Sequence, residues 1–139
     1  MKKAKRETKK TAKTRAKKPA KKPETKKQDR YFQALGRRKT SVARVRLWAR
    51  GDGKFTINGK LLENYFQLSE LKQQVLAPLA EMGSVDNFTI SALVKGGGFR
   101  GQAEALRHGV ARALVLFNAD FRKRLKKAGF LTRDPRMRE

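Results

Sequence analysis

Apolar and polar residues alternate from Ser41 to Arg50, and this is the clearest local pattern in the chain. One set is apolar and the other is rich in arginine: Ala43, Val45, Leu47 and Ala49 against Arg44, Arg46, Trp48 and Arg50. A period of two residues is typical of a β-strand with one buried face. The pattern therefore predicts a strand that presents arginine side chains on its exposed face.

Two further strands are expected. A short strand around Phe55 to Ile57 lies between an Asp-Gly pair at Asp52 and an Asn-Gly pair at Asn58. These dipeptides favour tight turns between antiparallel strands, so the pattern predicts an antiparallel hairpin here. The apolar run from Asn87 to Val94 predicts the other strand.

Helical spacing of apolar residues appears in three segments. The first is Ser69 to Met82, with Ser69 as the expected N-cap. The second follows three consecutive glycines and carries an apolar stripe: Ala103, Leu106, Val110, Leu114 and Phe117. The third is Asp120 to Ala128, and this helix is expected to stop at Gly129. The order of strands, helix, strand and helices predicts an α+β domain.

The charge of the chain is strongly positive, with 36 Lys and Arg residues against 12 Asp and Glu residues and a formal net charge of +24. Residues 1–29 hold 14 of the basic residues and no Leu, Ile, Val, Phe, Tyr or Trp. Such a segment buries too little apolar surface to offset its ordering entropy, so we expect a disordered basic arm. Residues 30–129 are expected to form one globular domain. The whole composition favours a polyanionic partner, nucleic acid before an anionic membrane.

Several classes of site are excluded by residue type. The chain has no cysteine, and its one histidine, His108, cannot hold a metal ion alone. No apolar run approaches the ~18 residues of a membrane span, and no apolar secretory segment follows the N-terminal charges. We expect a soluble intracellular protein without a cofactor. No nucleophile, base and acid stand in a catalytic pattern, so we expect no enzyme.

The glycines from Gly96 to Gly101 match the spacing of two nucleotide-binding motifs, G-x-G-x-x-G and the P-loop. A P-loop requires Lys and then Ser or Thr after the last glycine, where this chain has Gln102 and Ala103. A dinucleotide site requires an acidic residue at the end of a second parallel strand, but Asp120 follows a long helix. Neither nucleotide site is therefore expected.

The loop still has the physical features by which both motifs bind phosphate. Glycine lets a backbone approach a phosphate closely, and the N-terminus of a helix offers unpaired N–H groups. Lys95 and Arg100 add positive charge before and within the loop. The segment is expected to approach a phosphate of a polyanion. A second interpretation is a tight turn that packs the helix on the sheet, and the loop could serve both roles at once.

Several stretches of sequence together resemble one known family. They are "LGRRKTSVARV", "NGK", "YF", "VKGGGFRGQAEALRHGVARAL" and "LKKAGFLTRDPR", in this order between Tyr31 and Arg138. This set resembles the universal small-subunit ribosomal protein S nine family in its bacterial or organellar form. The resemblance implies an α+β fold like the second domain of ribosomal protein S five, with helices packed on a mixed sheet.

The resemblance also implies a function. It implies a structural constituent of the head of the small ribosomal subunit, which supports translation near the P site. The implied partners are the 3′ domain of the rRNA and neighbouring head proteins. A cytoplasmic ribosome is expected before an organellar one. Members of the family continue into a long basic tail that reaches tRNA in the P site. Here residues 130–139 are expected to be a shortened C-terminal extension, so that this contact with tRNA is not expected from it.

The residues expected to bind rRNA combine exposed basic positions with the motif positions of the family. From the motifs and the arginine-rich strand, they are Arg37, Arg38, Lys39, Thr40, Arg44, Arg46, Lys95, Gly96, Gly97, Gly98, Arg100, Gly101, Gln102, Arg107, His108 and Arg112. From the last helix and the C-terminal stretch, they are Arg122, Lys123, Lys126, Lys127, Arg133 and Arg136. The alternative from another class is a free nucleoid or chromatin-like binder, which the Lys, Ala and Pro composition of residues 1–29 alone suggests.

Overall fold

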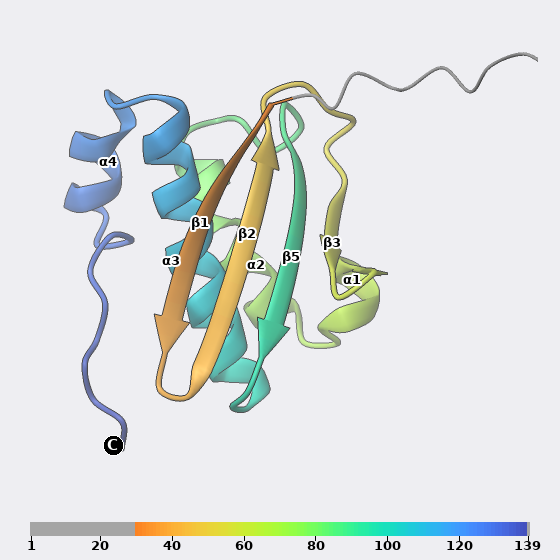
Figure 1. Cartoon of the computed structure of the whole chain (residues 1–139), viewed down its shortest axis with the longest axis vertical. Helices are drawn as coiled ribbons and strands as arrows, with labels where there is room; N and C mark the ends of the chain where they lie inside the picture. The colour runs from red at the N-terminus through yellow and green to blue at the C-terminus, as the bar shows by residue number, and fades with distance from the viewer. Residues whose placement is uncertain (1–29, 139) are drawn as a thin grey trace, which may run out of the picture.

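The computed structural model describes residues 30–138, so the basic arm expected over residues 1–29 lies outside the described part. The strands are β1 (Tyr31–Arg38), β2 (Ser41–Trp48), β3 (Phe55–Ile57), β4 (Lys60–Leu61) and β5 (Thr89–Lys95). The helices are α1 (Leu62–Tyr65), α2 (Ser69–Glu81), α3 (Phe99–Phe117) and α4 (Phe121–Lys127). Figure 1 shows the strands as one layer, with α2 and α3 on one side of it.

The five strands form one mixed sheet in the order β1-β2-β5-β3-β4. β5 is antiparallel to β2 and parallel to β3, which confirms the predicted α+β class with a mixed sheet. The Asn-Gly pair does make a turn, because Asn58 and Gly59 have φ of 49° and 82° and join β3 to β4. An antiparallel hairpin is therefore present between β3 and β4, but the Asp-Gly pair at Asp52 does not pair β2 with β3, because β5 lies between these two strands.

β1 is a strand that the sequence pattern did not predict. Its inward positions include Ala34, Gly36 and Arg38, all buried. Because glycine and arginine interrupt the apolar alternation that marks a strand, the pattern did not predict a strand here. β1 pairs with β2 along its whole length, from Tyr31 opposite Trp48 to Arg38 opposite Ser41.

The core lies between the sheet and the helices. Val45, Leu47 and Ile90 of the sheet are buried against the apolar stripe of α3. Leu106, Val110 and Leu114 of that stripe are fully buried, as the helical spacing predicted. Each fully buried side chain of this size contributes about 1.5–3 kcal/mol, so this layer holds α3 firmly behind the sheet.

β1 and α3 approach each other closely where two glycines meet. A Cβ on Gly36 would overlap the backbone oxygen of Ala105, and a Cβ on Gly109 would lie 2.7 Å from Cγ2 of Val45. Neither position has room for a larger residue. The glycines therefore let the strand that carries Arg37 and Arg38 rest directly on the helix.

The remaining helices differ from expectation in detail. Leu68, and not Ser69, is the N-cap of α2, and no side chain caps this end. α4 buries Leu125 and is followed by Gly129 at φ 81°, so the predicted stop is confirmed. None of the helices within residues 30–138 combines the length and the apolar character that spanning a membrane requires.

Candidate nucleic-acid interface

The face of the sheet turned away from α2 and α3 is open (Figure 1). The strand register arranges the outward side chains of β1, β2 and β5 in rows. Neighbours across the three strands are Arg37, Val42 and Lys95 in one row, Leu35, Arg44 and Leu93 in the next, and Gln33, Arg46 and Ser91 in the third. The arginine-rich face predicted for β2 is therefore extended by cations on both neighbouring strands.

The charge on this open face is of one sign. None of the outward side chains of β1, β2 and β5 is acidic. Arg46 is held in place, because its Nε donates to Oε1 of Gln33 at 3.2 Å and its guanidinium lies 5.1 Å from the centre of the Tyr31 ring. Uncompensated cations on a rigid surface favour the binding of a polyanion.

One end of this face is formed by the glycine loop after β5 and the turn between β1 and β2. Gly96 and Gly97 have φ of 75° and 67°, a conformation that glycine adopts without strain. A Cβ on Gly96 would lie 2.7 Å from the carbonyl oxygen of Thr40. The Ser41 hydroxyl donates to the carbonyl oxygen of Gly96 at 3.0 Å. The loop is thus packed against the turn that contains Lys39 and Thr40.

Gln102 supports the glycine loop from within α3. Its Nε2 donates to the carbonyl oxygen of Gly96 at 3.2 Å, and its Oε1 accepts from the Tyr65 hydroxyl at 2.8 Å. These bonds use both ends of the amide. Gln102 therefore shapes the loop, and the bonds leave its amide oxygen and nitrogen engaged with the protein.

Gly98 differs from the two glycines before it. It is the N-cap of α3, its φ is −95°, and nothing lies within 4 Å of a Cβ built there. No side chain caps the helix, and its first turn contains no acidic residue. The free N–H groups and positive dipole end of α3 point out beside the exposed Arg100. This part of the loop is exposed and has room for an approaching phosphate.

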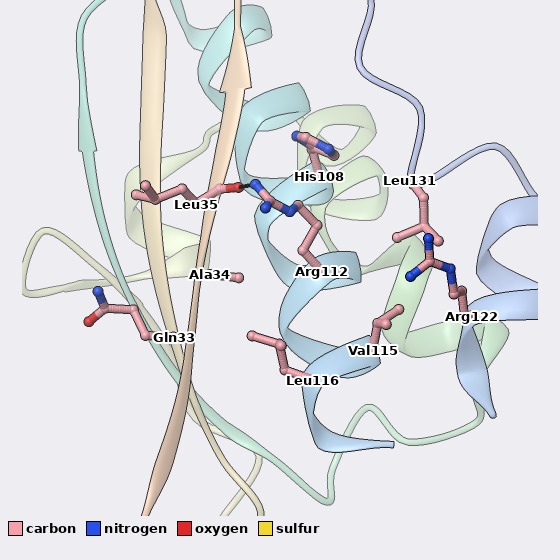
Figure 2. Close-up of a pocket in the computed structure, with 9 residues that line it drawn as sticks. All are labelled: Gln33, Ala34, Leu35, His108, Arg112, Val115, Leu116, Arg122 and Leu131. Atoms are coloured by element: carbon pink, nitrogen blue, oxygen red, sulfur yellow. Dashed lines mark hydrogen bonds between the residues drawn. The ribbon is translucent and has the colours of Figure 1, made fainter. Parts of the chain in front are cut away.

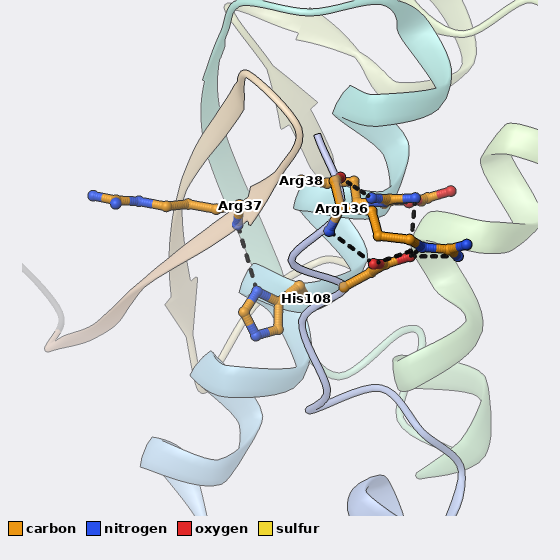
Figure 3. A network of polar contacts seen from close by, with 6 residues as sticks. Arg37, Arg38, His108 and Arg136 are labelled. Atoms are coloured by element: carbon orange, nitrogen blue, oxygen red, sulfur yellow. Dashed lines mark hydrogen bonds and ion pairs between the residues drawn. The ribbon is translucent and has the colours of Figure 1, made fainter. Parts of the chain in front are cut away.

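His108 and Arg112 of α3 hold the free edge of β1. Nη1 of Arg112 donates to the carbonyl oxygen of Leu35 at 2.6 Å (Figure 2), and the backbone N–H of Arg37 donates to Nδ1 of His108 at 3.4 Å (Figure 3). Burial lowers the pKa of His108 below 6.5, the positive charge of Arg112 lowers it further, and a hydrogen bond with the backbone of Leu131 raises it. His108 is thus mainly neutral at pH 7 and adds no positive charge to the surface.

Arg38 was expected to contact RNA, but its guanidinium is buried and paired with protein groups. It forms ion pairs with Glu104 and with Asp134, the latter at 3.2 Å, and its Nη1 donates to the carbonyl oxygen of Arg136 at 2.9 Å (Figure 3). Hydrogen bonds from Arg136, and the charges of Arg136 and Arg38, hold the pKa of Asp134 well below 3.8. Arg38 therefore ties the C-terminal stretch to the domain.

Arg107 is also turned toward the C-terminal stretch. Its guanidinium lies 5.9 Å from the centre of the Phe130 ring, and its Nε is buried without a hydrogen-bond partner among the described residues. Like Arg38, this side chain is placed to pack the stretch after α4. It does not lie with the cations of the open sheet face.

The basic residues of α4 form a separate surface. Arg122, Lys123, Lys126 and Lys127 are exposed, and α4 contacts α2 and α3 rather than the sheet. Arg124 donates from Nη2 to the carbonyl oxygen of Glu81 at 2.8 Å. Arg133 is exposed in the following stretch, and Arg136 pairs with Asp134 at 2.9 Å. The structure thus does not bring these positions together with Arg44 and Arg46.

Two aromatic residues on the open face were not predicted as site residues. The rings of Tyr31 and Trp48 are neighbours, with centroids 5.7 Å apart. Trp48 belongs to the alternating set on β2, but Tyr31 is brought to it only by the pairing of β1 with β2. The signal in the sequence is Trp48, an aromatic residue on the outward-facing side of an arginine-rich alternation.

Comparison with known proteins gives one consistent family. The family model described as Ribosomal protein S9/S16 matches residues 36–139. The proteins named Small ribosomal subunit protein uS9 from Mycobacterium avium (strain 104) and Mycolicibacterium paratuberculosis (strain ATCC BAA-968 / K-10) are 54% and 55% identical to the chain over 111 residues. The match covers 80% of this chain and 66% of each relative.

These matches confirm the resemblance that the motifs suggested, and they include the arginine-rich strand, the glycine loop and the C-terminal stretch. The matched family consists of ribosomal proteins, which agrees with the expectation that the chain is not an enzyme. The chain belongs to the ribosomal protein S9/S16 family, a family of structural small-subunit ribosomal proteins.

Proposed function

We propose that this chain is a structural constituent of the small ribosomal subunit and that it binds rRNA through the open face of its sheet. The observation that carries the proposal is the row arrangement of β1, β2 and β5. It places Arg37, Arg44, Arg46 and Lys95 on one rigid surface without an acidic side chain. Such a surface fits the phosphates of folded RNA by shape and charge rather than by reading base edges.

The glycine loop extends the same surface. Lys95 precedes the loop, and the uncapped start of α3 with Arg100 follows it. Backbone N–H groups at a helix start bind phosphate well, and Gly98 leaves room for the approach. Gln102 shapes the glycine loop, and Arg38 and Arg107 pack the C-terminal stretch. These three side chains are proposed to contact other protein groups rather than RNA.

The family also supports finer proposals about place. We propose that the chain lies in the head of the small subunit, against the 3′ domain of the rRNA and near the P site, in cytoplasmic ribosomes. The domain of residues 30–129 would make the main contact, and residues 1–29 would add diffuse contacts to phosphates. The free nucleoid-like binder remains the competing function, since residues 1–29 would suffice for it.

The test compares two arginine variants of the full chain for binding to small-subunit rRNA. Arg44→Gln should lower affinity and reduce the salt slope by somewhat under one unit, because one phosphate contact is lost. Arg124→Gln is the matched control, since Arg124 lies on the helical side and bonds to the backbone of Glu81. Equal effects of the two substitutions would favour a binder driven by residues 1–29 and general charge.

A further inference from the structure

A second candidate site lies on the other side of β1, away from the open sheet face. It is a cavity of about 580 Å³ between the free edge of β1, the last turns of α3, the start of α4 and Leu131 (Figure 2). Arg112 and Arg122 enter it from α3 and α4.

The charge of the cavity is positive and uncompensated. Arg112 and Arg122 line it, and no acidic residue does. A neighbouring cavity of about 300 Å³ around Arg38 differs, because Glu104 and Asp134 line it and neutralise part of its charge. Arg112 is fixed by its bond to the Leu35 carbonyl oxygen, so its remaining N–H groups are held ready for an anion.

The edge of β1 gives the cavity a short polar floor. Successive residues of a strand direct their backbone groups to opposite edges. The carbonyl oxygen of Leu35 and the N–H of Arg37 face the edge that α3 covers, and Arg112 and His108 occupy them. The same alternation turns the N–H and C=O of Gln33 to this edge, where Gln33 lines the cavity.

This arrangement decides between two kinds of occupant. An extended peptide that adds to a sheet needs a run of free N–H and C=O groups along the edge. Here His108 and Arg112 cover the edge at two of three alternate positions, so a peptide strand does not fit. One donor and one acceptor at Gln33 suffice for the edge of a single base.

The cavity also has an apolar wall. Ala34, Val115, Leu116 and Leu131 line the cavity, and Leu116 is 57% exposed. An exposed leucine beside two arginines offers a surface against which the face of a planar base is removed from water. Cations, a short polar floor and an apolar wall thus occur together in one cavity.

We propose that this cavity binds one unstacked nucleotide of an RNA strand, with its phosphate between Arg112 and Arg122, its base against Leu116, and its base edge at the backbone of Gln33. The proposal rests on rRNA binding as the proposed function and adds a second, separate subsite to it. It assigns Arg122 a specific contact that its neighbours on α4 lack.

The experiment measures the affinity of the full chain for a 12-nucleotide single-stranded RNA, an abasic strand of equal length, and a duplex RNA. Arg122→Gln should weaken binding of the single strand about tenfold, the loss of one charge-assisted contact. Arg124→Gln removes the same charge from the same helix and should weaken it less than about threefold. Leu116→Ser should weaken the single strand about threefold and leave the abasic strand unchanged.

The outcomes separate this proposal from the proposed function. Equal losses for Arg122→Gln and Arg124→Gln would overturn the nucleotide site, even where Arg44→Gln still weakens rRNA binding. A loss for Leu116→Ser that is the same on the abasic strand would overturn the base contact. Competition by a poly-glutamate peptide that depends on Arg122 and matches the RNA in affinity would show a peptide site instead. Thermal unfolding of each variant verifies that these exposed substitutions leave the fold intact.

Discussion

Ser41 donates its buried hydroxyl to the carbonyl oxygen of Gly96 at 3.0 Å, and this bond joins the turn after β1 to the glycine loop after β5. The two segments are 55 residues apart in the chain. Ser41→Ala removes the donor, so the unfolding free energy should fall by about 1 kcal/mol, as measured by urea denaturation. An unchanged midpoint would mean that Gln102 holds the Gly96 carbonyl oxygen well enough alone.

The neighbouring glycines Gly97 and Gly98 should respond differently to substitution. A Cβ on Gly97 would overlap the Ser41 hydroxyl, and its φ is 67°, so Gly97→Ala should destabilise the fold by about 1–3 kcal/mol. Gly98→Ser meets no neighbour and keeps a favourable N-cap, so stability should stay within about 0.5 kcal/mol.

The same Gly98→Ser variant should nevertheless bind rRNA less tightly, because its side chain stands where a phosphate would approach the start of α3. Stability is followed by thermal unfolding and affinity by filter binding. An unchanged rRNA affinity of Gly98→Ser would show that the loop does not contact RNA. A loss of stability in this variant would indicate that the loop serves as a structural turn.

The contact between β1 and α3 predicts a large effect at a position that looks unremarkable in the sequence. Gly36→Ala would place a methyl group on the carbonyl oxygen of Ala105. Because that carbonyl belongs to the packed backbone of α3 and cannot move aside, the substitution should destabilise the domain by about 3 kcal/mol or more. Gly59→Ala is the control, since its Cβ meets nothing within 4 Å and only its φ of 82° is unfavourable. Similar unfolding midpoints for the two variants would contradict this close approach.

Features that depend on residues close together in the chain could be predicted from the sequence, and features that join distant residues could not. The arginine face of β2 followed from alternation between neighbours, and the stripe of α3 followed from helical spacing. β1 stayed hidden because Gly36 and Arg38 occupy its buried positions. The pairing of Arg38 with Glu104 and Asp134 joins residues far apart in the chain, so local patterns could not separate this buried arginine from the exposed Arg37.

Stability should depend on pH through His108. Its pKa is lowered in the folded protein, mainly by burial, so the unfolded state binds a proton more readily. The stabilising contribution is complete above about pH 6.5 and is lost as pH falls toward the lower folded pKa. His108→Gln should therefore reduce the difference in unfolding free energy between pH 7.5 and pH 5.5. The difference is measured by urea denaturation, and an unchanged pH dependence would assign it to other groups.

The most direct test of the central claim is a hydroxyl-radical footprint of small-subunit rRNA with the full chain and with its Arg44→Gln, Arg46→Gln double variant. Both arginines lie on the open sheet face, and neither forms an ion pair among the described residues. If that face binds rRNA, the wild-type chain should protect a compact cluster of positions in the 3′ domain, and the double variant should lose those protections selectively. The same protections from both proteins, or protections scattered over the whole rRNA, would contradict binding through the sheet.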